Sequence, residues 1–465
     1  MNMINVRRLT VMTFLGAGML SSISAQISPL QVDTLKETKI PDQWDLQSCI
    51  DYAKEQNITI RKNRITAAST QIDVKTAKAA MFPSLSFSTS QQVVNRPYQE
   101  TSSRVSGNEI ISSNSKTSYN GNYGLNASWT LYNGNKRLKT IQQEKLNNQM
   151  AELDVATSEN NIQESIAQVY IQILYAAESV KVNENTLQVS IAQRDRGQEL
   201  LNAGSIAKSD LAQLEAQVST DRYQLVTAQA TLEDYKLQLK QLLELDGENE
   251  MNIYLPALSD ENVLAPLPTK KDVYIRALSL RPEIEASKLN VEASELGIGI
   301  AKSSYLPTIS LSAGIGTNHT SGSDFTFGEQ VKNGWNNSIG LSVSVPIFNN
   351  RQTKSAVQKA KLQYETSMLS LLDEQKALYK TIESLWLDAN SAQQRYAAAN
   401  EKLKSTQISY ELISEQFNLG MKNTVELLTE KNNLLQAQQE QLQAKYMAIL
   451  NTQLLKFYQG DQLAL

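Results

Sequence analysis

The amino-acid sequence contains one unit twice, and this internal repeat restricts the possible folds more than any other feature. Pro83 and Pro307 lie in matching segments at an offset of 224 positions (307 − 83). Further along, Gly204 and Gly420 match at an offset of 216 positions (420 − 204). The difference of eight (224 − 216) falls between the two matched regions, where a loop insertion is tolerated. The sequence therefore predicts two copies of one structural unit.

Proline-rich sequence near residues 247–270 marks the connection between the copies. Each copy has a short region of strand character followed by a very long region of helical character. We expect the following division of the chain: signal peptide 1–25, extended segment 26–43, first repeat 44–246, linker 247–270, second repeat 271–460 and tail 461–465.

The first 25 residues have the three-part pattern of a secretory signal peptide. Arg7 and Arg8 precede an apolar run that is too short to span a bilayer, and small residues follow up to Ala25. We therefore expect an exported protein. Cys49 lies too far downstream to be a lipid-attachment cysteine beside the cleavage site, and its apolar neighbours predict a small buried residue.

Four segments alternate apolar residues with serine, asparagine or glycine, the period-two pattern of a β-strand. The predicted strands are residues 83–95, 118–132, 307–318 and 337–348. A half-buried sheet in a soluble domain would give the same alternation. Small polar faces in an exported chain favour the wall of a membrane β-barrel. Four strands cannot close a barrel, and open edges in hydrocarbon are costly, so several chains would have to share one.

Each long helical region predicts a helical hairpin, over 136–246 and 352–458. In the second copy, two heptad rows displaced by four residues form the a/d seam of a coiled coil. Gly204 and Gly420 mark the hairpin turns. Asn423 and Glu426 predict a capping box at the start of the return helix. The second-copy rows are Leu371, Leu378, Leu385, Ala392 and Ala399, with Ile382, Ala389, Tyr396, Leu403, Tyr410 and Phe417.

Composition excludes several classes of function. The 44 basic and 48 acidic residues give a net charge of −4, which does not suit a nucleic-acid-binding surface. One histidine and one cysteine exclude a multi-histidine metal site and an intrachain disulfide framework. We expect no catalytic residues, cofactor or metal, and we expect His319 to be exposed in an outer loop.

Motifs in both copies give the chain a family resemblance. They are Ala77 to Pro83 and Ala301 to Pro307 at the first strands, Leu131-Tyr132-Asn133-Gly134 and Ile347-Phe348-Asn349-Asn350 at the second strands, Arg281-Pro282-Glu283-Ile284, and the glycine-then-acid pairs Gly204/Asp210 and Gly420/Glu426. Together, over residues 44–460, this chain resembles the outer membrane efflux protein family, the TolC-like channels.

The resemblance implies a mixed, mainly α fold in which long antiparallel coiled-coil hairpins accompany four membrane strands per chain. It implies a homotrimer that shares a 12-stranded β-barrel in the outer membrane and a 12-helix periplasmic tunnel. The implied function is passive conduction of small molecules or secreted polypeptides, without catalysis. The implied partners are a periplasmic adaptor, an inner-membrane pump of the RND or ABC type, and outer-membrane lipid.

The resemblance also indicates candidate sites. Small-residue turns meet the adaptor in this family, and here they correspond to Ala203, Gly204, Ser205, Leu419, Gly420 and Met421. In the family, acidic residues just above the second turn ring the closed aperture. Glu426 matches one such position, Thr429 occupies the other with Glu430 beside it, and Asp210 is the acid of copy one. Phe417 stands where the family often has a tyrosine that packs the closed state.

Other interpretations of these residues remain open. Glu426 could act only as a helix cap, which is compatible with a pore role. A periplasmic coiled-coil adaptor or tether without a pore would also contain long hairpins, although usually one, with glycine- and valine-rich β-domains. An envelope enzyme would need a cluster of catalytic residues. A protein-secretion duct would use the same channel body as a drug-efflux duct.

Overall fold

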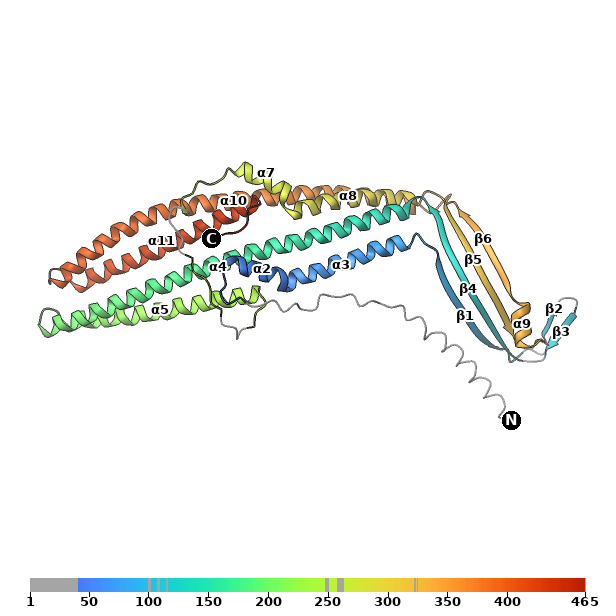
Figure 1. Ribbon diagram of the computed structural model, residues 1–465, viewed down its shortest axis with the longest axis horizontal. Helices are drawn as coiled ribbons and strands as arrows, with labels where there is room; N and C mark the ends of the chain where they lie inside the picture. The colour runs from blue at the N-terminus through green and yellow to red at the C-terminus, as the bar shows by residue number, and fades with distance from the viewer. Residues whose placement is uncertain are drawn as a thin grey trace, which may run out of the picture. The chain divides into compact units, whose positions relative to one another are not determined.

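The computed structural model describes residues 41–98, 102–106, 109–113, 116–246, 251–256, 263–321, 323 and 325–464 (Figure 1). The predicted signal peptide 1–25 and residues 26–40 of the predicted extended segment lie outside this part of the chain. The elements described below belong to one unit, Gln43–Leu465.

The two repeats contain matching elements in the same order. The first has α2 (Leu46–Gln56), α3 (Ile58–Ala79), β1 (Ser84–Asn95), β4 (Thr117–Asn133), α4 (Lys136–Asn202) and α5 (Lys208–Leu242). The second has α7 (Lys270–Leu280), α8 (Pro282–Ser303), β5 (Thr308–Thr320), β6 (Asn336–Ser344), α10 (Gln352–Asn418) and α11 (Thr424–Tyr458). The duplication seen in the sequence is therefore a duplication of structure.

The four strands form one antiparallel sheet in the order β1-β4-β5-β6. The central pair joins the repeats, because β4 of the first copy is paired with β5 of the second. Apolar residues occupy one face, where Leu125 lies between Phe87 and Ile315. Within this sheet, β1 and β6 each have one edge without a strand partner.

The loops between the predicted strands contain elements that the sequence analysis did not predict. A two-stranded sheet of β2 (Ser102–Ser106) and β3 (Glu109–Ser113) follows β1. Helix α9 (Phe327–Asn333) follows β5 and begins with a capping box between Thr326 and Glu329. Strand β6 ends at Ser344, before the predicted 348, because Pro346 has no N–H group to continue the ladder.

The prediction for His319 was wrong. His319 lies in β5, is only 8% exposed and is surrounded by aromatic rings. Its ring centroid is 5.3 Å from that of Tyr119, 5.9 Å from that of Tyr123 and 5.0 Å from that of Phe327. Burial follows because β5 extends to Thr320 and α9 packs back onto it; Gln330 of α9 accepts a hydrogen bond from the Thr320 N–H (2.9 Å).

Each strand leads into or out of its own long helix. Helix α3 precedes β1, α4 follows β4, α8 precedes β5, and α10 follows β6. The helices pack in the order α3-α4-α8-α10, which is the order of their strands (Figure 1). Helices and strands therefore form two continuous layers with the same lateral order.

Helices α4 and α10 have 67 residues each, or about 100 Å of helix. Each packs against its return helix, α4 against α5 and α10 against α11. The heptad seam predicted in the second copy is confirmed, because its central positions are buried. The buried seam residues are Leu378, Ile382, Ala389, Ala392, Tyr396, Ala399 and Phe417.

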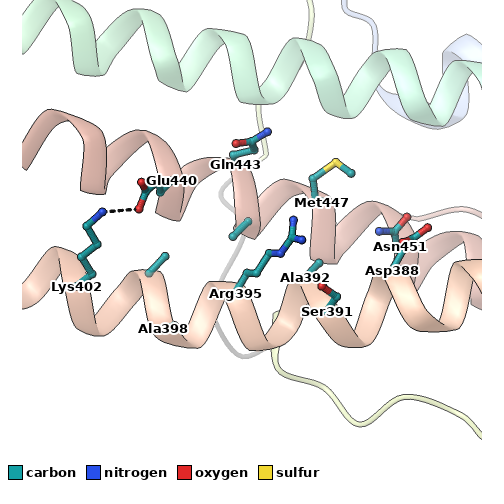
Figure 2. A pocket seen from close by; sticks show the side chains of 12 residues that line it. Asp388, Ser391, Ala392, Arg395, Ala398, Lys402, Glu440, Gln443, Met447 and Asn451 are labelled. Carbon is teal, nitrogen blue, oxygen red and sulfur yellow. Dashed lines mark hydrogen bonds and ion pairs between the residues drawn. The ribbon is translucent and has the colours of Figure 1, made fainter.

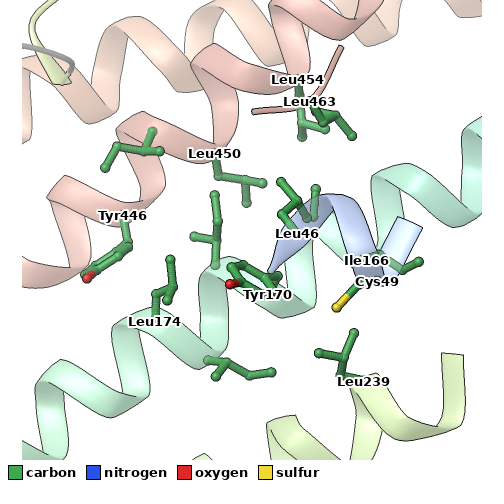
Figure 3. Close-up of a cluster of buried hydrophobic side chains, with 14 of the residues drawn as sticks. Leu46, Cys49, Ile166, Tyr170, Leu174, Leu239, Tyr446, Leu450, Leu454 and Leu463 are labelled. Atoms are coloured by element: carbon green, nitrogen blue, oxygen red, sulfur yellow. The ribbon is translucent and has the colours of Figure 1, made fainter. Parts of the chain in front are cut away.

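The largest apolar core joins the two repeats midway along the helices (Figure 3). Tyr170 of α4 is buried at its centre and donates a hydrogen bond to the Tyr254 carbonyl (2.6 Å). Cys49 is fully buried in the same core, as predicted, and burial raises the pKa of its thiol to about 12. A parallel β-bridge between Trp44 and Ile253 places the start of the described chain beside the linker.

Among the described helices, none combines the length and apolar character needed to cross a membrane.

Candidate functional site

Both hairpins turn at a glycine in the left-handed region, Gly204 with φ +76° and Gly420 with φ +73°. The Ser205 N–H donates to the Leu200 carbonyl (2.8 Å), and the Met421 N–H donates to the Gln416 carbonyl (2.8 Å). These hydrogen bonds satisfy carbonyl groups at the helix end that have no partner within the helix. Glycine adopts the positive φ of this turn without strain. The two predicted turns thus share one geometry.

The predicted contact residues around both turns are exposed. Ala203, Gly204 and Ser205 form the exposed turn of the first hairpin. In the second hairpin, Leu419 is 73% exposed and Met421 is 65% exposed. A side chain at Gly204 or Gly420 would meet no atom within 4 Å. The turns therefore expose small and apolar side chains. Among the described residues, no other segment of the chain covers the two glycines.

Two of the candidate acids, Asp210 and Glu426, cap the return helices of their hairpins. Asp210 accepts a hydrogen bond from the Ala207 N–H (3.0 Å) at the start of α5. Glu426 accepts one from the Asn423 N–H (3.3 Å), and Asn423 accepts one from the Glu426 N–H (2.9 Å). The predicted capping box is confirmed, and a carboxylate at a helix N-terminus also interacts favourably with the helix dipole.

Glu426 has a cationic partner that the sequence analysis missed. Lys422 lies four residues earlier, just before the N-cap of α11, and pairs with the Glu426 carboxylate at 2.5 Å. The hydrogen bond from Lys422 and that from the Asn423 backbone lower the pKa of Glu426 below its usual 4.5. The i, i+4 spacing of opposite charges was the signal that could have revealed this pair. The positive charge of Lys422 therefore partly offsets the negative charge of Glu426.

Glu430 and Thr429 behave differently from Glu426. Glu430 accepts a hydrogen bond from Ser409 of α10 (3.2 Å), so it links the two helices of the second hairpin. The Thr429 hydroxyl donates to the Val425 carbonyl of its own helix (2.8 Å). Glu426 and Glu430 thus lie one turn apart on α11, where four residues return to the same face.

Phe417 belongs to the junction between the two hairpins. It is buried with Leu214 of α5 and Leu427 of α11, and Tyr410 and Leu428 pack around them. Above this cluster, Gln193 of α4 donates a hydrogen bond to the Tyr410 hydroxyl (2.8 Å). The structure therefore brings Phe417 into a closed apolar contact near the turns, while Asp210 and Glu426 remain at separate helix ends.

A groove of about 590 Å³ follows α10 and α11 farther from the turns (Figure 2). Its lining alternates charged groups with small residues, and Lys402 of α10 pairs with Glu440 of α11 across it (2.7 Å). Within the described residues, no group of three or more His, Cys, Asp or Glu side chains could hold a metal ion.

Comparison with known proteins identifies the family. The family model for "Outer membrane efflux protein" matches residues 49–244 and 273–460, the two repeats. The outer membrane efflux protein BepC of Brucella suis is 24% identical over 294 residues, which cover 63% of this chain and 61% of BepC. The outer membrane protein TolC of Escherichia coli is 24% identical over 61% of this chain and 58% of TolC. The matched region thus spans about three-fifths of these relatives.

Solved structures extend the likeness to nearly the whole fold. A crystal structure of CusC, a protein described as undergoing conformational changes with folding and transmembrane channel formation, aligns with a TM-score of 0.76. The alignment covers 90% of this chain and 92% of CusC at 19% identity. The resemblance inferred from the repeated motifs is confirmed: this chain belongs to the outer membrane efflux protein family.

Proposed function

We propose that this chain forms a homotrimeric exit channel in the outer membrane that extends into the periplasm. In this role it passively conducts cargo delivered by an inner-membrane pump through a periplasmic adaptor, and it catalyses no reaction. The observation that carries the proposal is that the strands β1-β4-β5-β6 and the helices α3-α4-α8-α10 follow each other in the same order. Both layers therefore end on the same two flanks, one formed by β1 and α3 and the other by β6 and α10.

The sheet supports the proposal through its apolar face and its free edges. Phe87 of β1 and Ile339 and Leu341 of β6 lie exposed on that face. Such a face suits lipid, but each unpaired backbone group at an edge would cost several kcal/mol in hydrocarbon. Pairing β1 of one copy with β6 of the next removes both edges without changing the fold of either copy.

The long helices carry matching apolar stripes on the same two flanks. Ile58, Ile65 and Ile72 are exposed at heptad spacing on α3, and Leu362, Leu369 and Tyr379 are exposed on α10. Ile65 lies about 21 Å along α3 from its sheet-side end at Ala79, and Leu369 lies about 26 Å along α10 from its sheet-side end at Gln352. The two stripes run along overlapping lengths of their helices, so antiparallel α3 and α10 of neighbouring copies would cover each other's stripes.

A contact between two different flanks is head-to-tail, so repetition closes a ring when the rotation allows it. That the ring contains three copies is taken from the family resemblance, which implies a homotrimer. Three copies would contribute twelve strands and twelve long helices to one wall. This arrangement requires no catalytic or cofactor chemistry, and it places the hairpin turns at the end of the tube away from the sheet.

For the periplasmic end, we propose that Glu426, Glu430 and Asp210 line the aperture and that Phe417 packs its closed form. Three copies of Glu426 and Glu430 on one face of α11 would form an acidic ring, which attracts cations and repels anions. Lys422 moderates this ring because it already pairs with Glu426.

The exposed turns are the proposed adaptor contacts, at Ala203, Gly204, Ser205, Leu419, Gly420 and Met421. Two apolar side chains beside small residues suit docking of a helical hairpin. The pump behind that adaptor would be of the RND or ABC type, and the cargo would be small molecules or secreted polypeptides. The proposed export signal is residues 1–25, and Cys49 stays unmodified because it is buried.

Conductance in planar bilayers tests the proposal. The wild-type protein should open discrete ion channels, whereas Ile65→Lys with Leu369→Lys should abolish them, because two like charges would meet at each junction. The variant Ile65→Lys with Leu369→Glu should restore channels through opposite charges. Wild-type protein that inserts without conducting would contradict the channel, and normal channels in the double-lysine variant would contradict the α3–α10 junction.

A further inference from the structure

One polar cluster joins the two hairpins of a single chain and is not explained by the turns or the proposed aperture. It consists of Ser190 on α4, Asp221 on α5 and Lys431 on α11. The side chains of Asp221 and Lys431 are only 2% and 3% exposed. Among residues whose side chains the structure describes, they are the only buried carboxylate and the only buried lysine.

The hydrogen bonds of this cluster are mutually dependent. Lys431 donates to both Asp221 and Ser190, and the Ser190 hydroxyl donates to the same Asp221 oxygen, Oδ2. The other oxygen, Oδ1, accepts a hydrogen bond from Gln217 of α5 (2.9 Å). Removal of either charge would leave the other buried and unpaired, which is strongly destabilising.

The cluster differs in kind from the other contacts between the hairpins near the turns. Phe417, Leu214 and Leu427 form an apolar contact, and apolar side chains can repack after a shift of one helical turn. A neutral hydrogen bond joins Gln193 to Tyr410. A shift of about 5.4 Å would instead separate Lys431 from Asp221 while both stay buried.

The internal repeat does not predict the cluster. At the offset of 216, Lys431 corresponds to Glu215, Asp221 corresponds to Ala437, and Ser190 corresponds to Thr406. The ion pair is thus made once per chain, between α11 and the α4–α5 hairpin, and its pseudo-equivalent positions carry no matching pair. Lys431 lies about 10 Å along α11 from its first residue, Thr424, well above the turn.

We propose that the Ser190–Asp221–Lys431 cluster is a register lock that fixes the axial position of the second hairpin against the first. Buried polar groups act this way in coiled coils, where a single polar position selects one alignment among several that are apolar and nearly equivalent. The lock makes the two hairpins of one chain a single body at this level, so that they do not slide past each other by a turn.

Cysteine cross-linking in the full-length protein measures the register directly. Gln193→Cys with Tyr410→Cys reports the native alignment, and Gln193→Cys with Ser414→Cys reports an alignment shifted by one turn. Cys49 remains in place because it is fully buried. With the cluster intact, a short bifunctional thiol reagent should cross-link the native pair at least tenfold faster than the shifted pair.

Replacing the ion pair by Asp221→Leu with Lys431→Met keeps apolar volume but removes the lock. The preference for the native pair should then fall to less than threefold. The control Lys402→Met with Glu440→Leu removes an exposed ion pair inside the second hairpin and should leave the preference above tenfold. An unchanged preference in the Asp221→Leu, Lys431→Met variant would overturn the proposal.

Two further variants keep the test decisive if that variant fails to fold. Ser190→Ala removes only the bridging hydroxyl and should lower the preference two- to fivefold. Exchange of the charges by Asp221→Lys with Lys431→Asp keeps an ion pair at this position. This variant should retain at least half of the wild-type preference for cross-linking the native cysteine pair. A Ser190→Ala protein with the full native preference would overturn the lock, and none of these readouts depends on channel activity.

Discussion

Phe417 of the second hairpin and Leu214 of the first lie in one buried cluster beside the two turns, together with Leu427. The contact joins the α10–α11 hairpin to the α4–α5 hairpin just above the exposed turn residues. It is therefore the part of the proposed aperture in which packing, rather than charge, holds the hairpins together.

Replacing Phe417 by alanine should loosen this junction. Loss of a buried phenylalanine costs about 3–5 kcal/mol, so amide hydrogen exchange near both turns should accelerate at least a hundredfold. Leu419→Ala is the matched control, because Leu419 is exposed two residues away and should leave exchange unchanged. Equal rates for both variants would show that the cluster does not restrain the hairpins.

Removing the acidic pair should change conduction. With Glu426→Ala and Glu430→Ala, single-channel conductance should rise and block by divalent cations should weaken, because the acidic ring would be lost. Glu374→Ala, far from the turns on α10, serves as the control. A double variant with wild-type conductance and wild-type block would limit these glutamates to structural roles.

The start of α11 should depend on pH through Glu426. Its pKa lies below the usual 4.5, so the capping interaction stabilises the folded turn above that pH and is lost as pH falls through the lowered value. Hydrogen-exchange protection of the first turn of α11 should therefore decrease below about pH 4.5. Glu426→Gln keeps a capping side chain without a charge and should remove this dependence; protection independent of pH in the wild type would refute it.

Substitution at Gly420 should be limited by backbone strain alone. Its φ is +73°, and apart from Gly420 itself and its two chain neighbours no atom lies within 4 Å of the position of an added Cβ. Gly420→Val should destabilise the turn by about 1–2 kcal/mol, whereas Gly420→Asn should cost less because asparagine tolerates this conformation. Exchange rates at residues 416–424 measure the difference, and equal rates would mean that the turn changes its geometry.

Periodicity and turn chemistry made much of the fold predictable from the sequence. The heptad seam from Leu378 to Phe417 indicated the long helix, and Gly204 and Gly420 indicated where the hairpins turn. The alternation in β4 and β5 indicated strands, but not that these two strands pair between the repeats. These features are local, so a single sequence contains them.

Features that depend on contacts between distant segments were not predictable. His319 is buried because α9 folds back onto β5, and nothing in the neighbouring residues required that contact. Lys431 and Asp221 occupy positions that the internal repeat does not relate, so no pattern paired them. In the candidate site, the cap at Glu426 followed from its spacing to Asn423, whereas the partners of Phe417 came only from the packing of two hairpins.

The central claim is that one chain supplies only part of a wall and that three chains complete it. Native mass measurement of the detergent-purified protein tests this claim most directly, because it counts the chains in the particle. The account predicts a single species of three chains that dissociates in the Ile65→Lys, Leu369→Lys variant. A wild-type particle that contains one chain would contradict it.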